Sequence, residues 1–593
     1  MIRSVYHLLQ ETANVHKDQV AAQFYQKNGW AEITWGELEK QVNAVASGLV
    51  ELGAQPHDRV AILAKTKIEW PIVDLAILGA GCVTVPIYHS SALADIVFIL
   101  NDSGSKYLFV DDEDALLKCR EAKLSAPLLE KIICINTVSL RLENEEIPWA
   151  DIFDESVKHH KAIIERVENL NADDLATLVY TSGTTGEPKG VMLTHDNLLY
   201  EARAIEKFGI VTSADIQLLF LPLAHVFAKV LQIAWLKTAH TMVFAQSIEK
   251  IIDNMKEVRP TIMGSVPRIY EKVYAKVIAD IESASGAKGM IARWGLKQGE
   301  LATQKQKSNR VPGGFKWSLA QKLVFSKIGE KLHVLFGGRL RFFISGGAPL
   351  SPAIAYFFKH CGVTILEGYG LTETSAATCV NLPSHNRIGT VGKPVPGTEL
   401  QIAKDGEVLI RGRGVFKGYW NRAEDTKACL TPDGWFRTGD IGVLDHAGFL
   451  RITDRKKEII VNSGGKKIAP QKVENLIKSK IPLAGHVVVY GEGRPYLVAL
   501  IVLDEGNLRD WAKKRRIKKD YAQLLKDPSV KRVIDKEIKD VNASLASFEQ
   551  IKKFAILDHD FVIGGQLTPT LKVKRSVCYE QYQDILEALY SKK

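Results

Sequence analysis

The chain has 593 residues and a mass of 65.8 kDa, which exceeds the size at which one hydrophobic core normally stops growing, so we expect more than one domain. Hydrophobic residues make up 46% and charged residues 25% of the chain, as in an ordinary globular protein, and the lack of any internal repeat excludes a solenoid. The formal net charge of +10 favours anionic partners without identifying one.

Neither secretion nor insertion into a membrane is expected from the sequence. The seven cysteines are scattered, with no CxxC pair and no cluster at metal-ligand spacing, which predicts reduced thiols, no structural zinc and a cytosolic location. The first residues lack the apolar core of a signal peptide, and the most apolar region, residues 70–100, carries Asp74 and Asp95. We therefore expect no segment that spans a bilayer.

The first two thirds of the chain alternate strand-like and helix-like stretches, which is typical of an α/β fold. Residues 175–180 and 340–344 are apolar runs that lead directly into glycine-rich turns, the arrangement by which open α/β sheets build ligand sites. Between Ser283 and Trp317 the composition shifts to Gly, Lys, Gln and Ser. This shift predicts an inserted, exposed segment within the large domain.

The pattern changes again near Asp454, where short strand signals flank a charged turn and a helix is predicted with Pro470 near its first turn. Later apolar runs joined by a Gly-rich turn predict a hairpin. These strand and hairpin signals lie at residues 449–453, 458–461, 487–490 and 496–502. We therefore expect a large domain over residues 1–454 and a small α+β domain over residues 455–593.

A loop at residues 180–190, Tyr-Thr-Ser-Gly-Thr-Thr-Gly-Glu-Pro-Lys-Gly, concentrates hydroxyls and glycines. Glycines let backbone N–H groups approach phosphate oxygens, hydroxyls donate further hydrogen bonds, and Lys189 supplies a point charge. The loop is not a Walker A motif, because Lys189 follows Pro188 and precedes Gly190. The alternative is a flexible surface linker, but a linker has no need to follow directly on a buried strand.

This string resembles the phosphate-binding signature of the adenylate-forming superfamily, which includes acyl-CoA synthetases, luciferases and peptide-synthetase adenylation domains. Further motifs match that family in order, from about the first helix to Lys574. The resemblance implies an α/β fold with a large multi-sheet N-terminal domain, a smaller mobile C-terminal domain, and ATP with Mg²⁺ as ligands. The phosphate-binding residues that it implies are Thr181, Ser182, Gly183, Thr184, Thr185, Gly186 and Lys189.

The string Glu-Gly-Tyr-Gly-Leu-Thr-Glu-Thr that begins at residue 367 resembles the family's adenine and metal motif, and Ser-Gly-Gly-Ala-Pro-Leu resembles a companion turn. An aromatic ring can lie against a purine, and a carboxylate can hold Mg²⁺ between phosphates. The resemblance implies that Tyr369 flanks adenine and that Thr372 contacts the α-phosphate, while Glu373 and Thr181 hold the magnesium. The nucleotide-binding residues implied by the two strings are Gly346, Gly347, Ala348, Gly368, Tyr369, Gly370 and Thr372.

The string Gly-Trp-Phe-Arg-Thr-Gly-Asp that ends at Asp440 resembles the family's ribose motif. The resemblance implies that the Asp440 carboxylate accepts hydrogen bonds from both ribose hydroxyls and that Arg455 reaches the same sugar. Residues 454–458 resemble the hinge between the two domains, with Lys457 at the pivot position. A solvated β-turn is the structural alternative for this segment, and the two interpretations are compatible.

Two segments of the small domain resemble parts of the family's catalytic machinery. One is the loop that admits the pantetheine arm of coenzyme A, for which a simple hairpin turn is the alternative; its residues are Ser463, Gly464 and Gly465. The other is the segment Pro-Thr-Leu-Lys-Val-Lys-Arg, which occupies the place of the catalytic lysine. The spacing favours Lys572 over the neighbouring Lys574.

His225 follows Pro-Leu-Ala in a string that resembles the motif whose histidine lies beside the acyl chain. A lone histidine near an apolar run is more often a packed core residue, and the order of the motifs favours the functional interpretation. The aromatic gate that some bacterial relatives carry four residues later is replaced here by Lys229.

The resemblance to long-chain fatty acid CoA ligases implies ATP-dependent activation of a fatty acid to acyl-AMP, followed by transfer of the acyl group to coenzyme A. One alternative is a fatty acyl-AMP ligase that passes the adenylate to a carrier protein, and another is a catalytically silent nucleotide-binding protein. The implied partners are a fatty acid, ATP and CoA, with no nucleic acid. Peripheral contact with the inner face of a membrane is also predicted, and the basic run at residues 513–519 is its candidate surface.

Overall fold

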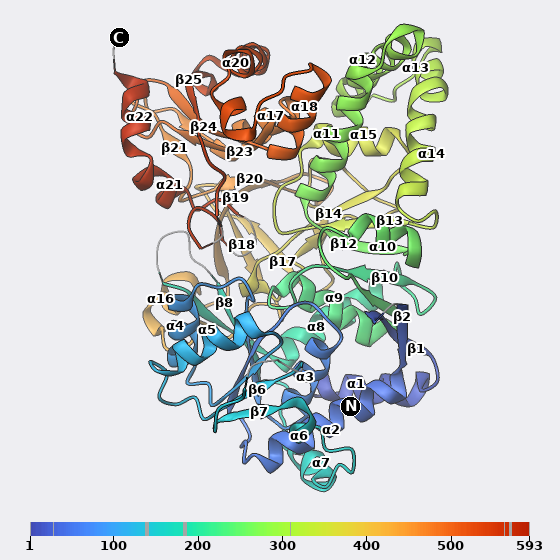
Figure 1. Ribbon diagram of the computed structural model, residues 1–593, viewed down its shortest axis with the longest axis vertical. Helices are drawn as coiled ribbons and strands as arrows, with labels where there is room; N and C mark the ends of the chain where they lie inside the picture. Colours follow the sequence, from blue (N-terminus) through green and yellow to red (C-terminus); the bar gives the residue numbers. More distant parts are fainter. Residues whose placement is uncertain are drawn as a thin grey trace.

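The computed structural model describes residues 2–27, 29–136, 141–181, 187–308, 310–562, 564–568 and 572–591. One of its two large sheets has seven strands in the order β7-β6-β5-β3-β4-β8-β9, all parallel except β9 at the edge (Figure 1). The strands are β3 (Arg59–Leu63), β4 (Val83–Ile87), β5 (Tyr107–Val110), β6 (Lys131–Cys134), β7 (Glu146–Pro148), β8 (Leu175–Thr181) and β9 (Lys189–Thr194).

The second large sheet has nine strands in the order β16-β15-β14-β13-β12-β10-β11-β1-β2. Its centre, from β14 to β1, is parallel, and both ends are antiparallel. The strands are β1 (Val20–Gln26), β2 (Gly29–Thr34), β10 (Ile216–Leu219), β11 (Thr241–Phe244), β12 (Ile262–Ser265), β13 (Phe342–Ser345), β14 (Ile365–Tyr369), β15 (Cys379–Val380) and β16 (Lys393–Pro394). The apolar runs predicted at residues 175–180 and 340–344 correspond to β8 and, shifted by one or two residues, to β13.

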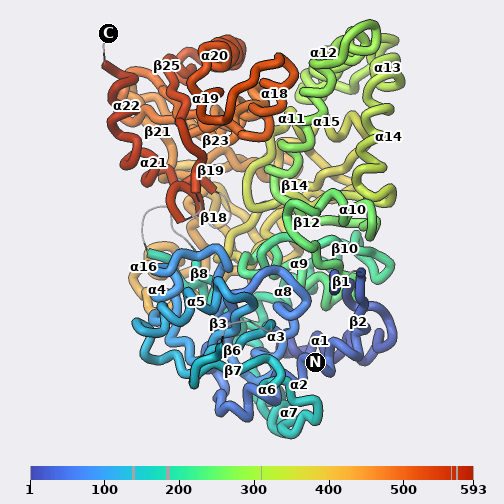
Figure 2. The backbone as a smooth tube through the Cα atoms, viewed as in Figure 1, coloured from blue at the N-terminus to red at the C-terminus, as the bar shows by residue number. Residues whose placement is uncertain are grey.

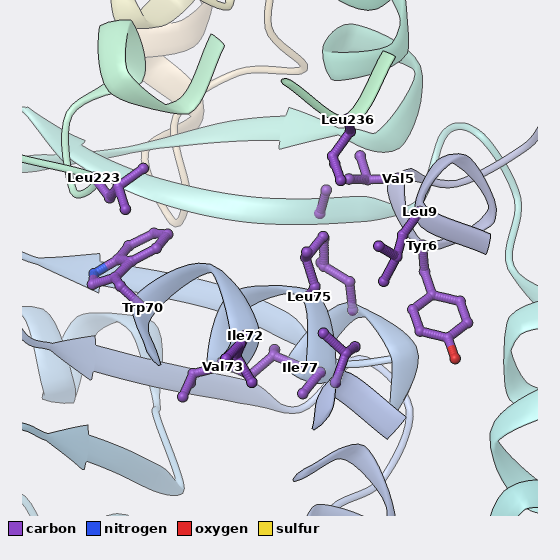
Figure 3. Close-up of a cluster of buried hydrophobic side chains, with 14 of the residues drawn as sticks. Val5, Tyr6, Leu9, Trp70, Ile72, Val73, Leu75, Ile77, Leu223 and Leu236 are labelled. Atoms are coloured by element: carbon purple, nitrogen blue, oxygen red, sulfur yellow. The ribbon is translucent and has the colours of Figure 1, made fainter. Parts of the chain in front are cut away.

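The main hydrophobic core lies between the two sheets and is filled by helices. Figure 3 shows part of it, including Val5, Leu9, Trp70 and Leu236. The helix that carries Trp70 is buried on all sides, which explains why its sequence is apolar without helical periodicity. No helix in the described part of the chain is long and apolar enough to cross a bilayer. The core helices are α1 (Val5–His16), α2 (Trp35–Glu51), α3 (Glu69–Gly79), α8 (His195–Phe208) and α9 (Val226–Thr238).

Local sequence signals fix where several helices begin. Helix α2 starts at a capping box, in which the Thr34 hydroxyl accepts from the Glu37 N–H at 3.2 Å and the Glu37 carboxylate accepts from the Thr34 N–H at 2.8 Å.

The segment predicted as an exposed insertion is mostly helical. The other helices of this region are α4 (Leu93–Ser103), α5 (Glu113–Lys123), α6 (Trp149–Ile152), α7 (His160–Asn169), α10 (Ile251–Val258), α11 (Pro267–Ser283), α12 (Gly286–Lys307), α13 (Phe315–Ala320), the π-helix η1 (Gln321–Phe325), α14 (Ser326–Leu335), α15 (Pro352–His360) and α16 (Ala423–Cys429).

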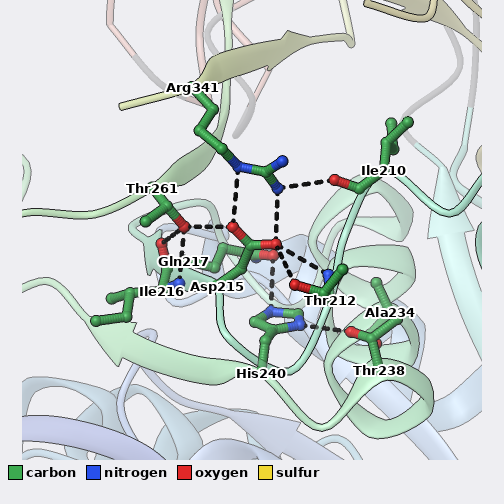
Figure 4. Close-up of polar contacts among 10 residues, drawn as sticks. All are labelled: Ile210, Thr212, Asp215, Ile216, Gln217, Ala234, Thr238, His240, Thr261 and Arg341. Carbon is green, nitrogen blue, oxygen red and sulfur yellow. Dashed lines mark hydrogen bonds and ion pairs between the residues drawn. The ribbon is translucent and has the colours of Figure 1, made fainter. Parts of the chain in front are cut away.

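A buried carboxylate ties together the N-terminal ends of three neighbouring strands. Asp215, just before β10, accepts from the Thr261 hydroxyl at 2.6 Å and from Arg341 at 2.7 and 3.1 Å (Figure 4). Nearby, His240 contacts Thr238 at 2.7 Å, and burial lowers the pKa of His240 to about 4. These contacts fix the edge of the sheet opposite to the strand ends that carry the predicted site.

A second buried charge pair joins α3 to α9. Lys229 donates to Asp74, Gln232 donates to the same carboxylate oxygen at 2.8 Å, and the Lys229 amine lies 5.8 Å from the centre of the Trp70 ring. The side chains of Lys229 and Asp74 are 5% and 0% exposed. Lys229, at the position of the aromatic gate of some relatives, therefore neutralises a carboxylate in the core.

The last quarter of the chain has its own sheets and its own core. A four-stranded antiparallel sheet, β17 (Glu399–Ile402), β18 (Glu407–Arg411), β19 (Phe436–Leu444) and β20 (Leu450–Arg455), leads into it. Beyond it, hydrophobic clusters of the described residues draw only on residues from 460 onward. Figure 2 shows this part, in orange to red, gathered at one end of the molecule. Its elements are β21 (Ile460–Val461), β22 (Lys467–Ile468), α17 (Pro470–Lys480), β23 (Ala484–Tyr490), β24 (Leu497–Leu503), α18 (Glu505–Lys514), α19 (Tyr521–Leu525), α20 (Pro528–Asn542), β25 (Ile551–Ile556), α21 (Arg575–Gln581) and α22 (Gln583–Tyr590).

The predicted elements of this part are found with one correction. Pro470 is the first residue of α17, and β23 and β24 form the expected antiparallel pair. The strand predicted at residues 458–461 begins only at Ile460. The reason is a turn in which the Glu458 N–H donates to the Arg455 carbonyl at 2.9 Å.

We predict that Lys229→Met lowers the free energy of unfolding of the large domain by about 3 to 5 kcal/mol, because it leaves the Asp74 carboxylate buried without a counter-charge. The double variant Asp74→Asn/Lys229→Met should regain most of that loss, since the introduced amide is neutral and its oxygen can still accept from Gln232. Denaturant unfolding monitored by tryptophan fluorescence would measure both. Equal stability of the single variant and the wild type would contradict this account.

Candidate active site

A buried carboxylate lies where three strands meet. Asp440 of β19 is 3% exposed and pairs across the sheet with Arg455, the last residue of β20. The Tyr369 hydroxyl at the end of β14 donates to Asp440 Oδ2 at 2.7 Å, and Arg455 Nε lies 3.3 Å from Oδ1. Burial raises the pKa of Asp440, while Arg455 and the hydrogen bond from Tyr369 oppose the rise. The structure thus brings together three predicted residues that are far apart in sequence.

A second carboxylate, Glu373, lies in the short 3₁₀ helix η2 (Thr372–Thr374) that follows β14. It accepts a hydrogen bond from the Tyr419 hydroxyl at 2.8 Å, and the Lys189 amine lies 5.1 Å from the centre of the Tyr419 ring. Burial and the Glu373 charge raise the pKa of Tyr419. Sequence reasoning missed Tyr419; the Gly-Tyr-Trp string at residues 418–420 was the only available signal.

The ends of β8 and β9 bring part of the predicted phosphate loop to this carboxylate. The Thr181 hydroxyl contacts the Lys189 carbonyl at 3.5 Å, and Lys189 forms an ion pair with Asp425 at 2.7 Å. The predicted residues Ser182, Gly183, Thr184, Thr185 and Gly186 lie outside the described residues.

Glu373 and Thr181 supply the oxygen ligands that Mg²⁺ prefers. Within the described residues, Oε2 of Glu373 accepts no hydrogen bond, while Oε1 is taken by Tyr419. The oxygen donors of Glu373 and Thr181 therefore fit the ligand preference of a magnesium ion.

The turn after Tyr369 requires glycine for reasons of space. A Cβ atom at Gly370 would lie 1.2 Å from the Ala376 carbonyl oxygen, so any side chain there would displace the backbone. In the companion turn, Gly346 is buried and a Cβ would lie 3.2 Å from the Phe227 ring, whereas Gly347 and Ala348 are exposed. Gly368 has its nearest backbone neighbour, the Cys379 carbonyl, 3.4 Å from the position of a Cβ.

His225 caps helix α9. Its Nδ1 accepts from the Phe227 N–H at 3.0 Å, and burial together with the Lys572 charge lowers the pKa of His225 to about 3. Because Nδ1 accepts that hydrogen bond, the neutral ring carries its proton on Nε2. The imidazole is therefore a neutral donor, near enough to Lys572 to feel its charge.

Lys572 reaches this cluster from the last part of the chain. Its backbone is held by hydrogen bonds to Thr568 at 2.8 and 3.0 Å. The residue has exposed surface, yet protein atoms crowd its amine, and this crowding with the Arg455 charge lowers the pKa of Lys572 to about 8. The carboxylates of Asp440 and Glu373 act in the opposite direction. The charges that act on Asp440 include that of Lys572.

The hinge segment is fixed on both sides of Lys457. Lys456 pairs with Asp405 at 2.6 Å and Glu407 at 3.0 Å in the first part of the chain, whereas Glu458 pairs with Arg575 at 3.0 Å in the last part. Lys457 itself is exposed.

The loop of Ser463, Gly464 and Gly465 is not part of the cluster around Asp440. It is exposed between β21 and β22, and its hydrogen bonds run to Asn462 at 3.1 Å and to Arg494 at 3.0 Å.

The cluster around Asp440 has groups that can bind a polyanion. They are the three cations Arg455, Lys189 and Lys572 and the neutral His225 imidazole. The Asp440 carboxylate can accept hydrogen bonds from hydroxyl groups.

Comparisons with known proteins agree with this arrangement. Residues 9–420 match the family described as AMP-binding enzyme, and residues 457–593 match the AMP-binding enzyme C-terminal domain. The chain is 38% identical over 573 residues to the long-chain-fatty-acid–CoA ligase FadD15 of Mycobacterium bovis, covering 95% of this chain and 93% of the relative.

Two further relatives extend the comparison. The long-chain-fatty-acid–CoA ligase ACSBG2 of Xenopus laevis is 30% identical, covering 99% of this chain and 84% of the relative. Among solved structures, the adenylation domain of a carboxylate reductase from Mycobacterium chelonae superposes with a TM-score of 0.76 at 22% identity, covering 99% of this chain and 91% of that one.

We predict that Gly370→Ala destabilises the turn between Tyr369 and Glu373 and lowers the thermal unfolding midpoint by several degrees, because the added carbon collides with the Ala376 carbonyl. Gly313→Ala is the matched control, since Gly313 has open space around its Cβ position. Differential scanning calorimetry would compare the two. Unchanged unfolding in Gly370→Ala would show that the turn differs from the one described.

Proposed function

Because the chain belongs to the AMP-binding enzyme family, we propose that it converts long-chain fatty acids to acyl-CoA in two steps that share the site around Asp440. The family resemblance and the fold class predicted from the sequence are confirmed by matches over both parts of the chain. Relatives named as long-chain-fatty-acid–CoA ligases cover almost the whole chain. The carrier-protein ligase and the silent nucleotide-binding protein are therefore not favoured.

The first step forms an acyl-adenylate. The fatty acid carboxylate attacks the α-phosphorus of ATP, and pyrophosphate leaves in line. Lys572 and Thr372 contact the α-phosphate, and Lys189 with the loop at residues 181–186 holds the leaving phosphates. Glu373 and Thr181 would hold a magnesium ion, which would supply positive charge against the charge that develops on the pyrophosphate. The His225 imidazole lies beside the acyl carboxylate and donates from Nε2.

The adenosine is held by the strand ends. Tyr369 lies against the adenine, with Gly346, Gly347, Ala348, Gly368 and Gly370 lining the approach. Asp440 accepts hydrogen bonds from the ribose hydroxyls, and Arg455 contacts the same sugar. A carboxylate has about four lone-pair directions, so Asp440 can keep its bond from Tyr369 while it accepts two more. The Tyr369–Asp440 hydrogen bond of 2.7 Å is the observation that supports this assignment most directly.

The second step transfers the acyl group to the CoA thiol and requires a different face of the small domain. Ser463, Gly464 and Gly465 line the pantetheine passage, and a rotation at Lys457 exchanges them with Lys572. We place the domain boundary between residues 454 and 455. The hydrophobic clusters that draw only on residues from 460 onward support a division in this region, and the ion pairs of Lys456 and Glu458 reach opposite parts of the chain on either side of Lys457.

The cellular setting follows from the substrates. We propose a cytoplasmic enzyme that contacts the membrane peripherally, because its fatty acid substrate partitions into lipid. The basic run at residues 513–519 is the surface that the sequence favours. The scattered positions of the seven cysteines favour a reducing compartment.

The proposed function predicts that the chain releases AMP and pyrophosphate and forms acyl-CoA from free CoA with no carrier protein added. Lys572→Ala should lower the adenylation rate by a factor of about 10² to 10³, because the lysine charge acts where phosphate charge develops. Thioester formation from supplied acyl-AMP should be largely retained. A quenched assay of each half-reaction would measure both rates.

The pH dependence of the adenylation rate provides a control for the role of Lys572. With a pKa of about 8, Lys572 loses its charge as the pH rises, so adenylation should decline above pH 8. Lys572→Arg stays charged throughout this range, and its residual activity should not decline. Loss of adenylation in Lys574→Ala but not in Lys572→Ala would show that the catalytic lysine is Lys574.

We further predict that Lys457→Pro separates the two half-reactions. Proline fixes φ near −65° and restricts the preceding residue, which opposes the backbone change that rotation requires. Pyrophosphate release should survive, while transfer to CoA falls by orders of magnitude. Equal losses in both steps with an unchanged thermal melt would place the pivot elsewhere, and a lowered melt would indicate unfolding of the small domain.

A further inference from the structure

Two large apolar side chains are exposed to solvent where the chain passes from α12 to α13. Val311 and Phe315 are 89% and 81% exposed, on either side of a Pro-Gly-Gly turn. Its base is nevertheless fixed, because the Trp317 ring packs 4.9 Å from the His360 ring and Gln321 donates to the His360 carbonyl at 2.8 Å. The two side chains are thus presented outward by an anchored loop.

The helices that carry this loop are packed closely. A Cβ atom at Gly295 would lie 2.5 Å from Val324, and one at Gly299 would lie 2.4 Å from Phe325. Both glycines therefore let α12 approach η1 directly. Helix α12 has 22 residues, a length of about 33 Å, and Figure 1 shows α12 and α13 at the upper end of the molecule, away from the two large sheets.

Most of the net charge of the chain lies in this insertion. Residues 283–317 contain seven basic residues and one acidic residue, a formal charge of +6, against +10 for the whole chain. The one acid, Glu300, is paired with Lys480 at 3.1 Å. Four cations surround the exposed apolar pair, and within the described residues none of them pairs with an acid. They are Lys305, Lys307, Arg310 and Lys316, all exposed.

We propose that the insertion tip, defined as residues 305–308 and 310–317, docks on the anionic surface of a lipid bilayer. Val311 and Phe315 enter the interface, and the surrounding cations contact lipid phosphates. The inference deepens the proposed function, on which it rests, because it names the surface through which the enzyme meets the lipid that holds its substrate. A bilayer matches the tip because two apolar side chains are too small an interface for a stable protein partner.

The tip fits this role better than the basic run at residues 513–519. In that run Lys519 is paired with Asp527 at 2.7 Å, Lys514 donates to the Ala279 carbonyl at 3.1 Å, and Arg515 lies over the Trp511 ring at 4.5 Å. No large apolar side chain of the run is fully exposed. The run therefore lacks the apolar component that an interfacial contact requires.

Cosedimentation with vesicles of phosphatidylcholine, with and without phosphatidylglycerol, tests the proposal. We expect the wild type to bind only the anionic vesicles. Val311→Ser/Phe315→Ser should weaken binding at least about tenfold. Replacing the four tip cations by Gln should weaken it more than about a hundredfold, since each cation near an anionic surface contributes about fivefold.

Two matched controls keep the test specific. Leu124→Ser/Leu128→Ser removes apolar side chains that are 87% and 58% exposed on a different surface, and Lys513→Gln/Arg516→Gln/Lys518→Gln removes charge from the basic run. Both should bind as the wild type does. Absence of wild-type binding to anionic vesicles, full binding by the tip variants, or loss confined to the basic-run variant would each overturn the proposal.

A ligase assay with a short, water-soluble fatty acid separates this inference from the proposed function. The tip variants should form its acyl-CoA at the wild-type rate, because the tip lies outside the cluster around Asp440. Vesicle binding without any acyl-CoA formation would contradict the proposed function and leave the docking surface standing.

Discussion

The site depends on the interactions that the buried carboxylate of Asp440 makes with its neighbours. It lies at the junction of β14, β19 and β20, accepts from Tyr369, faces Arg455, and feels the charge of Lys572 from the last part of the chain. A buried carboxylate is stable only when such partners surround it. The same charge that fixes the strand ends therefore also acts on a lysine from the last part of the chain.

The small domain is attached to the large one by charges instead of by a shared core. Its hydrophobic clusters contain none of the described residues before 460, and its contacts with α11 include the ion pairs of Arg268 with Asp504 at 2.8 Å and of Lys478 with Glu271 at 3.4 Å. These four side chains are 13% to 30% exposed, so water reaches both pairs. An interface held by charged pairs without a shared apolar core is what the proposed rotation of the small domain requires.

The sequence predicted the parts of the site that consist of short contiguous strings, such as the turn around Gly370 and the segment that ends at Asp440. It could not predict contacts between distant side chains. Tyr419 meets Glu373 only because the chain after β18 folds back over η2, and Lys229 is an ion-pair partner only because α3 delivers Asp74 to it. The ion pairs on either side of Lys457 could not be predicted either, because Asp405 and Arg575 are distant in sequence from residues 456–458.

The placement of charge follows from the same division between fixed and moving parts. Under the proposed rotation at Lys457, a lipid contact carried by the small domain would have to break or would drag the enzyme across the surface. The insertion belongs to the large domain, so under the same proposal its seven cations stay in place while Lys572 and the loop at Ser463 exchange. Glu300 of the insertion forms an exposed ion pair with Lys480 of the small domain at 3.1 Å. The proposed contact on the large domain would thus let the enzyme remain at the source of its apolar substrate through both half-reactions.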